Sequence, residues 1–267
     1  MAFLAGEAEN PGLYYEVHGG GPDLILIHGL GSSLQDWEYQ IPVFAKYFRV
    51  HALDLRGFGR SDKPDGPYSI PVLAQDILRF MDQLHLQQAH IVGISMGGWI
   101  GLQLAVSHPQ RIASLTAVNC GADVIPKSLK QWFELLLRLV LFRFLSMERI
   151  GDILSRRLFP GPDQVKLRET LAARWAENHK AIYLKTFQGL VGWSVAGQLG
   201  QIQCPTHIIT AEHDYTDLAS KQNMVNLIPN ATLTIIENTR HALPLEQPEQ
   251  FNQASLGFLR EIEPSAN

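Results

Sequence analysis

The segment from residue 90 to residue 98 constrains the fold of this chain more than any other, because an apolar run leads directly into a glycine-rich turn. The β-branched residues of this run predict a buried strand, and the residues after the turn have the spacing of a helix. Gly93 and Gly97 stand two positions on either side of Ser95, where a Cβ atom would collide with the opposite limb of a sharp turn. This strand–turn–helix pattern predicts a strained turn that exposes the Ser95 hydroxyl.

Short apolar runs alternate with helical patterns along most of the chain. The expected strands and helices together cover residues 13–17, 23–27, 48–54, 69–84, 89–94, 99–106, 112–119, 206–210, 218–227 and 233–236. Strands that alternate with helices predict a mostly parallel sheet with helices on both faces. The almost wholly apolar run 23–27 is typical of a strand buried on both faces, whereas residues 13–17 predict an edge strand.

The strand pattern disappears between residues 122 and 191, where helical spacing and bulky apolar side chains take over. Because this stretch follows one expected strand and precedes the next, we interpret it as a helical insertion. The predicted organisation is a core of residues 1–121 and 192–267 with a helical cap of residues 122–191. Ligands of open α/β sheets bind at the carboxyl ends of the strands, so we expect the cap to cover that edge.

Composition excludes several classes of function. A net charge of −4, with no run of lysine and arginine, argues against a nucleic-acid partner. Cys120 and Cys204 are too few for a disulfide framework, and the first residues show no basic and apolar leader, which together predict a cytoplasmic protein. No histidine spacing is typical of a metal site, and we expect neither a metal nor a cofactor. The oligomeric state is not predicted.

One apolar stretch, residues 129–145, is nearly long enough to span a bilayer. It contains four charged residues, each of which costs about 2.5–3.5 kcal/mol near the centre of a bilayer. We therefore predict no integral membrane segment but an amphipathic helix with a wide apolar face. Glu134 and Arg138, with Arg143 at a wider spacing, are expected to share its polar face. A peripheral membrane contact stays open as an alternative.

The chain resembles the α/β-hydrolase fold family over essentially its whole length. The resemblance rests on the motifs HGLG at residues 28–31, DLRGFGRSD at 54–62, GISMGG at 93–98, EHD at 212–214 and RH at 240–241. It implies the α/β-hydrolase fold, a mostly parallel sheet flanked by helices, with a small helical cap inserted. It also implies catalytic groups in the order serine, acid, histidine, which here gives Ser95, Asp214 and His241.

The chemistry of these three residues agrees with that order. A serine hydroxyl needs a base within hydrogen-bond distance, and histidine suits this role because its pKa lies near neutrality. An acid must orient the imidazole and stabilise the imidazolium that forms. Asp217 and Asp123 stay open as alternatives to Asp214, whereas His241 is the only histidine after the last expected strand.

The resemblance also implies an oxyanion hole made by the backbone N–H groups of Leu30 and Met96. His28, beside this loop, is interpreted as a structural residue. We expect the substrate pocket to draw on bulky apolar residues of the cap and its surroundings, with these candidates: Trp132, Phe133, Phe187, Trp193 and Leu243.

The resulting hypothesis is a serine hydrolase that cleaves carboxylic esters of small to medium acyl chain through an acyl-enzyme intermediate. Its partner would be a small-molecule ester or lactone. A lactonase is the nearest alternative, since a lactone is a cyclic ester; the resemblance extends to enol-lactone and acyl-homoserine lactone hydrolases. A receptor that binds a small ligand on the same fold is a more remote alternative.

Overall fold

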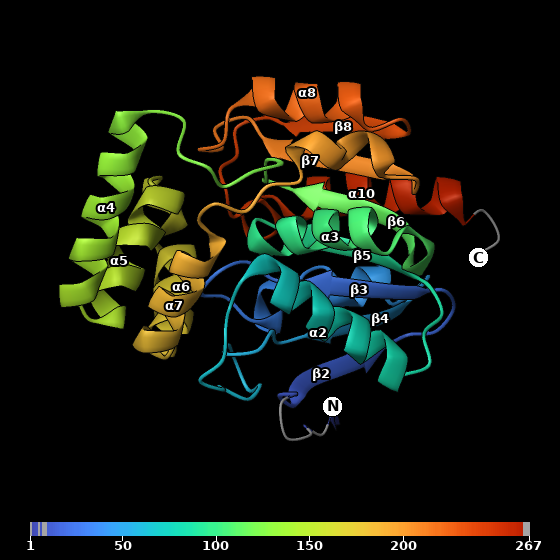
Figure 1. The fold of residues 1–267 in the computed structure, drawn as a ribbon, viewed down its shortest axis with the longest axis horizontal. Helices are drawn as coiled ribbons and strands as arrows, with labels where there is room; N and C mark the ends of the chain where they lie inside the picture. The colour runs from blue at the N-terminus through green and yellow to red at the C-terminus, as the bar shows by residue number, and fades with distance from the viewer. Residues whose placement is uncertain (1, 5, 7–9, 264–267) are drawn as a thin grey trace.

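The computed structural model describes residues 2–4, 6 and 10–263, and an eight-stranded sheet forms its centre (Figure 1). The strands are β1 (Ala2–Leu4), β2 (Leu13–His18), β3 (Asp23–Ile27), β4 (Arg49–Leu53), β5 (Ala89–Ile94), β6 (Ile112–Val118), β7 (Thr206–Ala211) and β8 (Ala231–Ile236). Their order in the sheet is β1-β2-β4-β3-β5-β6-β7-β8. β3 to β8 run parallel to one another, and the antiparallel pairs within the described sheet are β1 with β2 and β2 with β4. The predicted mostly parallel sheet is confirmed.

Helices cover both faces of the sheet (Figure 1). The helices outside the segment between β6 and β7 are α1 (Ile41–Phe44), α2 (Ile70–Gln83), α3 (Met96–Ser107), α8 (Leu218–Leu227), α9 (Leu243–Glu246) and α10 (Pro248–Ile262). In β3, Ile25 and Ile27 pack in one hydrophobic cluster with α2 and α3, whereas Leu24 and Leu26 pack in a second cluster with α1 and α10. All four side chains are fully buried, as expected for a strand between two layers of helices.

The prediction that residues 13–17 form an edge strand is wrong. β1 pairs antiparallel with the outer side of β2, with Phe3 opposite Tyr14 and Leu4 opposite Leu13. β2 itself pairs with β4 on its other side. β1 has only three residues, which is too short to show an alternating pattern, so its existence depends on pairing with β2 rather than on a local signal.

Four α-helices lie between β6 and β7. They are α4 (Leu129–Phe144), α5 (Met147–Leu158), α6 (Val165–Ala176) and α7 (Lys180–Leu190), and we call them the cap helices. Figure 1 places them beyond the edge of the sheet toward which the arrow of β6 points. Because β3 to β8 are parallel, the loops that follow β3, β5, β7 and β8 reach this same edge. The division of the chain into a core and a cap at residues 122 and 191 stays a prediction.

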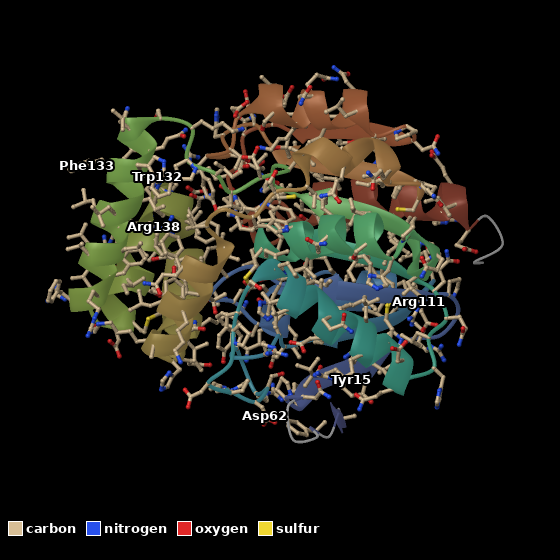
Figure 2. All side chains as sticks on the ribbon, viewed as in Figure 1. Tyr15, Asp62, Arg111, Trp132, Phe133 and Arg138 are labelled. Carbon is tan, nitrogen blue, oxygen red and sulfur yellow. The ribbon has the colours of Figure 1, made fainter. Side chains whose placement is uncertain are left out.

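α4 departs from the expectation for an amphipathic helix, because large apolar side chains are exposed on its outer side and one charged residue points inward. Phe133, on its outer side in Figure 2, is 66% exposed, and within α4 only Phe142 is buried. Arg138, which was expected on the polar face with the exposed Glu134, is instead half-buried. Its guanidinium lies 4.8 Å from the ring centre of Phe187, and this cation–π contact lets a charged group enter an apolar interior. No helix in the described part of the chain combines the length and the apolar composition needed to cross a bilayer.

His207, in β7, makes the fold sensitive to acid. Its side chain is buried, with Nε2 2.8 Å from the hydroxyl of Thr234, while Nδ1 is buried without a partner in the described structure. Burial lowers the pKa of His207 from 6.5 to about 4. Between these two pH values the unfolded chain binds a proton at His207 that the folded protein does not bind. The free energy of unfolding therefore falls as the pH falls through this range, by about 3 kcal/mol from this one residue.

His207→Gln keeps a donor for Thr234 but cannot titrate. Between pH 6.5 and pH 4 we expect the free energy of unfolding of this variant to fall by about 3 kcal/mol less than that of the wild type. Denaturant unfolding at a series of pH values measures this difference. His179→Gln, at an exposed position, is the control and should follow the wild type. Parallel curves for wild type and His207→Gln would contradict the assignment of acid sensitivity to His207.

Candidate active site

Ser95 joins β5 to α3 in a strained conformation, with φ of 54° and ψ of −114°. Its N–H donates to the carbonyl of Val118 at 2.8 Å, which fixes the turn against β6. A Cβ atom on Gly93 would lie 2.3 Å from the carbonyl oxygen of Gly97, and one on Gly97 would lie 2.1 Å from that of Ile27. No larger residue fits at either position, so both glycines are needed for the turn that presents Ser95.

Asp214 and His241 come together at the same edge of the sheet, in the loops that follow β7 and β8. The Oδ1 atom of Asp214 lies 2.6 Å from Nδ1 of His241. Burial by itself would raise the pKa of Asp214, but the hydrogen bond and charge of His241 and the charge of Lys221 outweigh it and lower this pKa to about 2. Asp214 is therefore a carboxylate at neutral pH, able to orient the imidazole and to stabilise its cation.

Lys221, on α8, is a partner of Asp214 that the sequence did not reveal. Its Nζ lies 2.7 Å from Oδ2 of Asp214 and 2.8 Å from the carbonyl of Thr216, and its side chain is 1% exposed. The two oxygens of Asp214 thus face two different groups, the imidazole on one side and a buried ammonium on the other. α8 shows no clear apolar face, so its pattern could not indicate that position 221 points into the protein.

Asn119 is a second functional position that the sequence analysis missed. It follows β6 with φ of 48°, and its side-chain amide donates to the carbonyl of His241 at 2.9 Å. Its side-chain oxygen accepts from the N–H of Ala211 at 2.8 Å. Asn119 therefore ties the loop that carries His241 to the end of β7, next to Asp214. An asparagine directly after a buried strand, at a positive φ that asparagine tolerates, is the signal that could have found it.

Tyr215 occupies the free side of His241. Its hydroxyl lies 2.5 Å from Nε2, and its ring stacks on the imidazole with centroids 4.0 Å apart. Burial of the hydroxyl and the nearby charge of Asp214 raise the pKa of Tyr215, although a hydrogen bond with Ser95 acts in the opposite direction. The phenol is thus neutral and lies between Ser95 and His241, and it takes the position on Nε2 that a direct contact with Ser95 would need. The residue as a whole is 57% exposed, so only its tip is enclosed.

The loop after β3 lies against Ser95. A Cβ atom on Gly29 would be 3.6 Å from Cβ of Ser95, which brings the following residue, Leu30, beside the serine. Met96 is the first residue of α3, where a backbone N–H has no partner within the helix and the helix dipole favours negative charge. This placement suits the oxyanion role that we predict for both amides. His28 is fully buried and its Nε2 accepts from the N–H of Leu55 at 3.0 Å, as expected for a structural residue.

The five residues proposed for the substrate pocket lie in different surroundings. Phe187 and Trp193 are each 8% exposed, and the indole of Trp193 donates to Gln103 on α3 at 2.9 Å. Trp132 and Phe133 are 51% and 66% exposed. Leu243 is fully buried in the cluster that α10 shares with the sheet. The structure thus places Phe187 against Phe142 and Arg138 of the cap helices and Trp193 against α3, and no described contact joins any of the five residues to Ser95.

A cavity of about 100 Å³ lies beside these loops, lined by residues 32–35, 54, 57, 59–60, 63, 174 and 177–178. None of the three expected catalytic residues lines it. Arg174, in its wall, is already paired with carboxylates, since it contacts Asp36 at 3.0 Å and Glu38 at 2.7 Å. Within the described residues, no group of three histidine, cysteine or acidic side chains could hold a metal ion.

Comparison with known proteins agrees with this geometry. The sequence model of the alpha/beta hydrolase fold matches residues 22–248. The chain belongs to the α/β-hydrolase fold family. It is 31% identical to a protein of Caulobacter sp. (strain K31) provisionally named carbamate hydrolase RutD, over 93% of this chain and 96% of that protein. It is 32% identical to 3-oxoadipate enol-lactonase 2 of Acinetobacter baylyi, over 87% of this chain and 86% of the enzyme.

Solved structures extend the likeness to three dimensions. A hydrolase from Pseudomonas aeruginosa PA01 superposes with a TM-score of 0.86 at 28% identity, and the alignment covers 97% of both chains. The α/β-hydrolase fold predicted from the sequence is thereby confirmed. Within this family the order serine, acid, histidine along the chain is the order in which Ser95, Asp214 and His241 occur.

The buried Lys221 allows a test of the Asp214–His241 pair. Replacement by methionine removes a cation close to the pair and leaves the full negative charge of Asp214 acting on the imidazole. We expect labelling of Ser95 by a fluorophosphonate to reach its full rate only at higher pH than in the wild type. The acid limb of the profile of labelling rate against pH should shift up by about one pH unit. Lys166→Met, at an exposed position on α6, is the control and should leave the profile in place. An unshifted limb in Lys221→Met would contradict the electrostatic role of Lys221.

Proposed function

We propose that the protein is a serine hydrolase that cleaves carboxylic esters of small to medium acyl chain, with Ser95, Asp214 and His241 as its catalytic triad. The observation that carries the proposal is the 2.6 Å contact between Asp214 and His241, beside a serine held in a strained turn. A buried carboxylate bonded to a histidine, close to a serine hydroxyl, is the arrangement that acyl transfer requires. Membership of the α/β-hydrolase fold family supports it.

In the proposed reaction His241 Nε2 takes the proton of Ser95, and Oγ attacks the ester carbonyl. The N–H groups of Leu30 and Met96 hold the negative oxygen of the tetrahedral intermediate. The C–O bond breaks, the alcohol leaves with the proton from His241, and the acyl group remains on Ser95. Water then attacks this acyl-enzyme while His241 again accepts a proton, which releases the carboxylic acid and restores the serine. Throughout, Asp214 stabilises the positive charge on the imidazole.

A lactonase is the second candidate, because the similarity to an enol-lactonase at 32% identity favours it. A lactone is a cyclic ester, so the same groups open it and the alcohol stays attached to the acyl-enzyme. The relative named as a carbamate hydrolase makes a carbamate a further substrate to compare. All three classes place a carbonyl carbon next to Ser95. A lactone keeps the leaving alcohol tethered to the acyl group, whereas a carbamate has nitrogen in place of carbon on the acyl side of the carbonyl.

The decisive experiment is an initial-rate panel on wild type and Ser95→Ala. It compares p-nitrophenyl esters of increasing acyl length, simple and acyl-homoserine lactones, and an alkyl carbamate. We expect Ser95→Ala to lower kcat by at least about 10³-fold for every substrate that the wild type turns over. Ser107→Ala, which changes an exposed serine at the end of α3, is the control. Retained activity in Ser95→Ala would overturn the mechanism, and faster lactone opening than ester cleavage would make the protein a lactonase.

Tyr215 needs to leave its position for this mechanism to operate. Its hydroxyl occupies Nε2 of His241 at 2.5 Å, where Ser95 must donate its proton. The exposure of the ring gives it room to turn toward solvent when a substrate enters. A hydrogen bond of this kind contributes about 0.5–1.5 kcal/mol, so its loss should favour the competent state by about two- to tenfold.

We therefore expect Tyr215→Phe to raise kcat/KM for a short p-nitrophenyl ester by about two- to tenfold. Tyr39→Phe, at an exposed position away from the triad, is the matched control. If kcat/KM fell by tenfold or more in Tyr215→Phe, the phenol would instead relay the proton between Ser95 and His241.

A further inference from the structure

Arg138 is a half-buried cation that points between the cap helices, and none of the described carboxylates forms an ion pair with it. Its guanidinium lies 5.2 Å from the ring centre of Phe142 and 4.8 Å from that of Phe187. Its Nε is buried without a hydrogen-bond partner, and no carboxylate of the described residues lies within 4.0 Å of its nitrogens. The neighbour that does receive a hydrogen bond from it is the neutral hydroxyl of Tyr183.

Two other arginines that point inward, Arg56 and Arg174, are neutralised by carboxylates. Arg56 is bonded to Asp76 through two nitrogens, and Arg174 of the cap contacts Asp36 and Glu38. Removing a guanidinium from water without such a partner is unfavourable, and contacts with two aromatic rings offset only part of that cost. Arg138 stands on a helix whose outer side is open to solvent, so its inward position is not forced by a lack of room outside (Figure 2).

The surroundings of Arg138 lead to the candidate active site. Phe142 and Tyr183 form one hydrophobic cluster, and Leu30, the expected oxyanion residue, packs against it. The ring of Tyr183 lies so close to the next residue of that loop that a Cβ atom on Gly31 would be 2.8 Å from it. The charge of Arg138 also acts on the Tyr215 hydroxyl, which contacts His241. Arg138 therefore faces the space between the cap helices and the loop beside Ser95.

We propose that Arg138 binds a carboxylate on the acyl part of the substrate, remote from the ester bond that Ser95 attacks. The acyl part is the one that lies against the loop of Leu30, whose amide is expected to hold the acyl oxygen. The substrate class is then a half-ester of a dicarboxylic acid, or a lactone that carries a free carboxylate. Guanidinium pairs bidentately with carboxylate, and the neighbouring rings exclude water from the pair. This inference rests on the proposed function, since it names the substrate of that same site.

The test compares esters matched in length. Methanol release is followed from monomethyl succinate, glutarate and adipate, and from the methyl esters of the neutral monocarboxylic acids of the same chain length. We expect the wild type to turn over at least one half-ester with kcat/KM about tenfold or more above its neutral counterpart, mainly through a lower KM. Arg138→Gln should remove this preference by raising the KM for the half-esters to about that for the matched neutral esters. Arg138→Lys, which keeps the charge but not the planar fork, should retain part of it.

Controls separate this idea from a structural role of Arg138 and from failure of the proposed function. Arg143→Gln, at an exposed position on the same helix, should keep the wild-type preference. Equal loss of half-ester and neutral-ester turnover in Arg138→Gln, or no preference in the wild type, would overturn the proposal. Absence of turnover of every ester by the wild type would instead overturn the proposed function. The wild-type comparison and Arg138→Lys remain decisive even where Arg138→Gln does not fold.

Discussion

Close approach of two backbone segments is the constraint on which the rest of the site depends. The turn after β5 lies so near the end of β3 that a Cβ atom on Gly97 would be 2.1 Å from the carbonyl oxygen of Ile27. This contact holds Ser95 beside the loop of Leu30, and the hydrogen bond from Ser95 to Val118 holds it against β6. Because β3, β5 and β6 are parallel neighbours, one steric fit aligns the nucleophile with the amides expected to stabilise the oxyanion.

Charge at the other half of the site is arranged around Asp214. A buried carboxylate is unfavourable unless it is paired, and here His241 and Lys221 take one oxygen each. The ammonium ion keeps the carboxylate ionised without occupying the oxygen that orients the imidazole. Asn119 adds a purely geometric restraint, because it joins the backbone of His241 to that of Ala211. The histidine is thus positioned from its ring and from its main chain at once.

The parts of the site that could be predicted are those with a local signal or a fixed order along the chain. Ser95 has a strand and two glycines around it, and Asp214 and His241 follow parallel strands whose carboxyl ends share one edge. Lys221 and Tyr215 carry no such signal, since a lysine on a helix and a tyrosine in a loop are usually solvated. Their positions follow from tertiary packing alone. The inward orientation of one arginine on α4 was missed for the same reason, because helical periodicity describes faces but not which face meets the protein.

The cap helices connect substrate recognition to the oxyanion loop through the same contacts. Tyr183 packs on Gly31, where a Cβ atom would lie 2.8 Å from the ring. The φ of 75° at Gly31 is a second reason why only glycine fits there. Asn178, in the loop between α6 and α7, donates to the carbonyl of Gly31 at 2.7 Å, so this loop and α7 both restrain the residue that follows Leu30. A group that binds between α4 and α7 therefore presses on the loop that presents the Leu30 amide. In this arrangement, binding energy from the remote end of a substrate can act on the geometry at the reacting carbonyl, which is where it increases the rate.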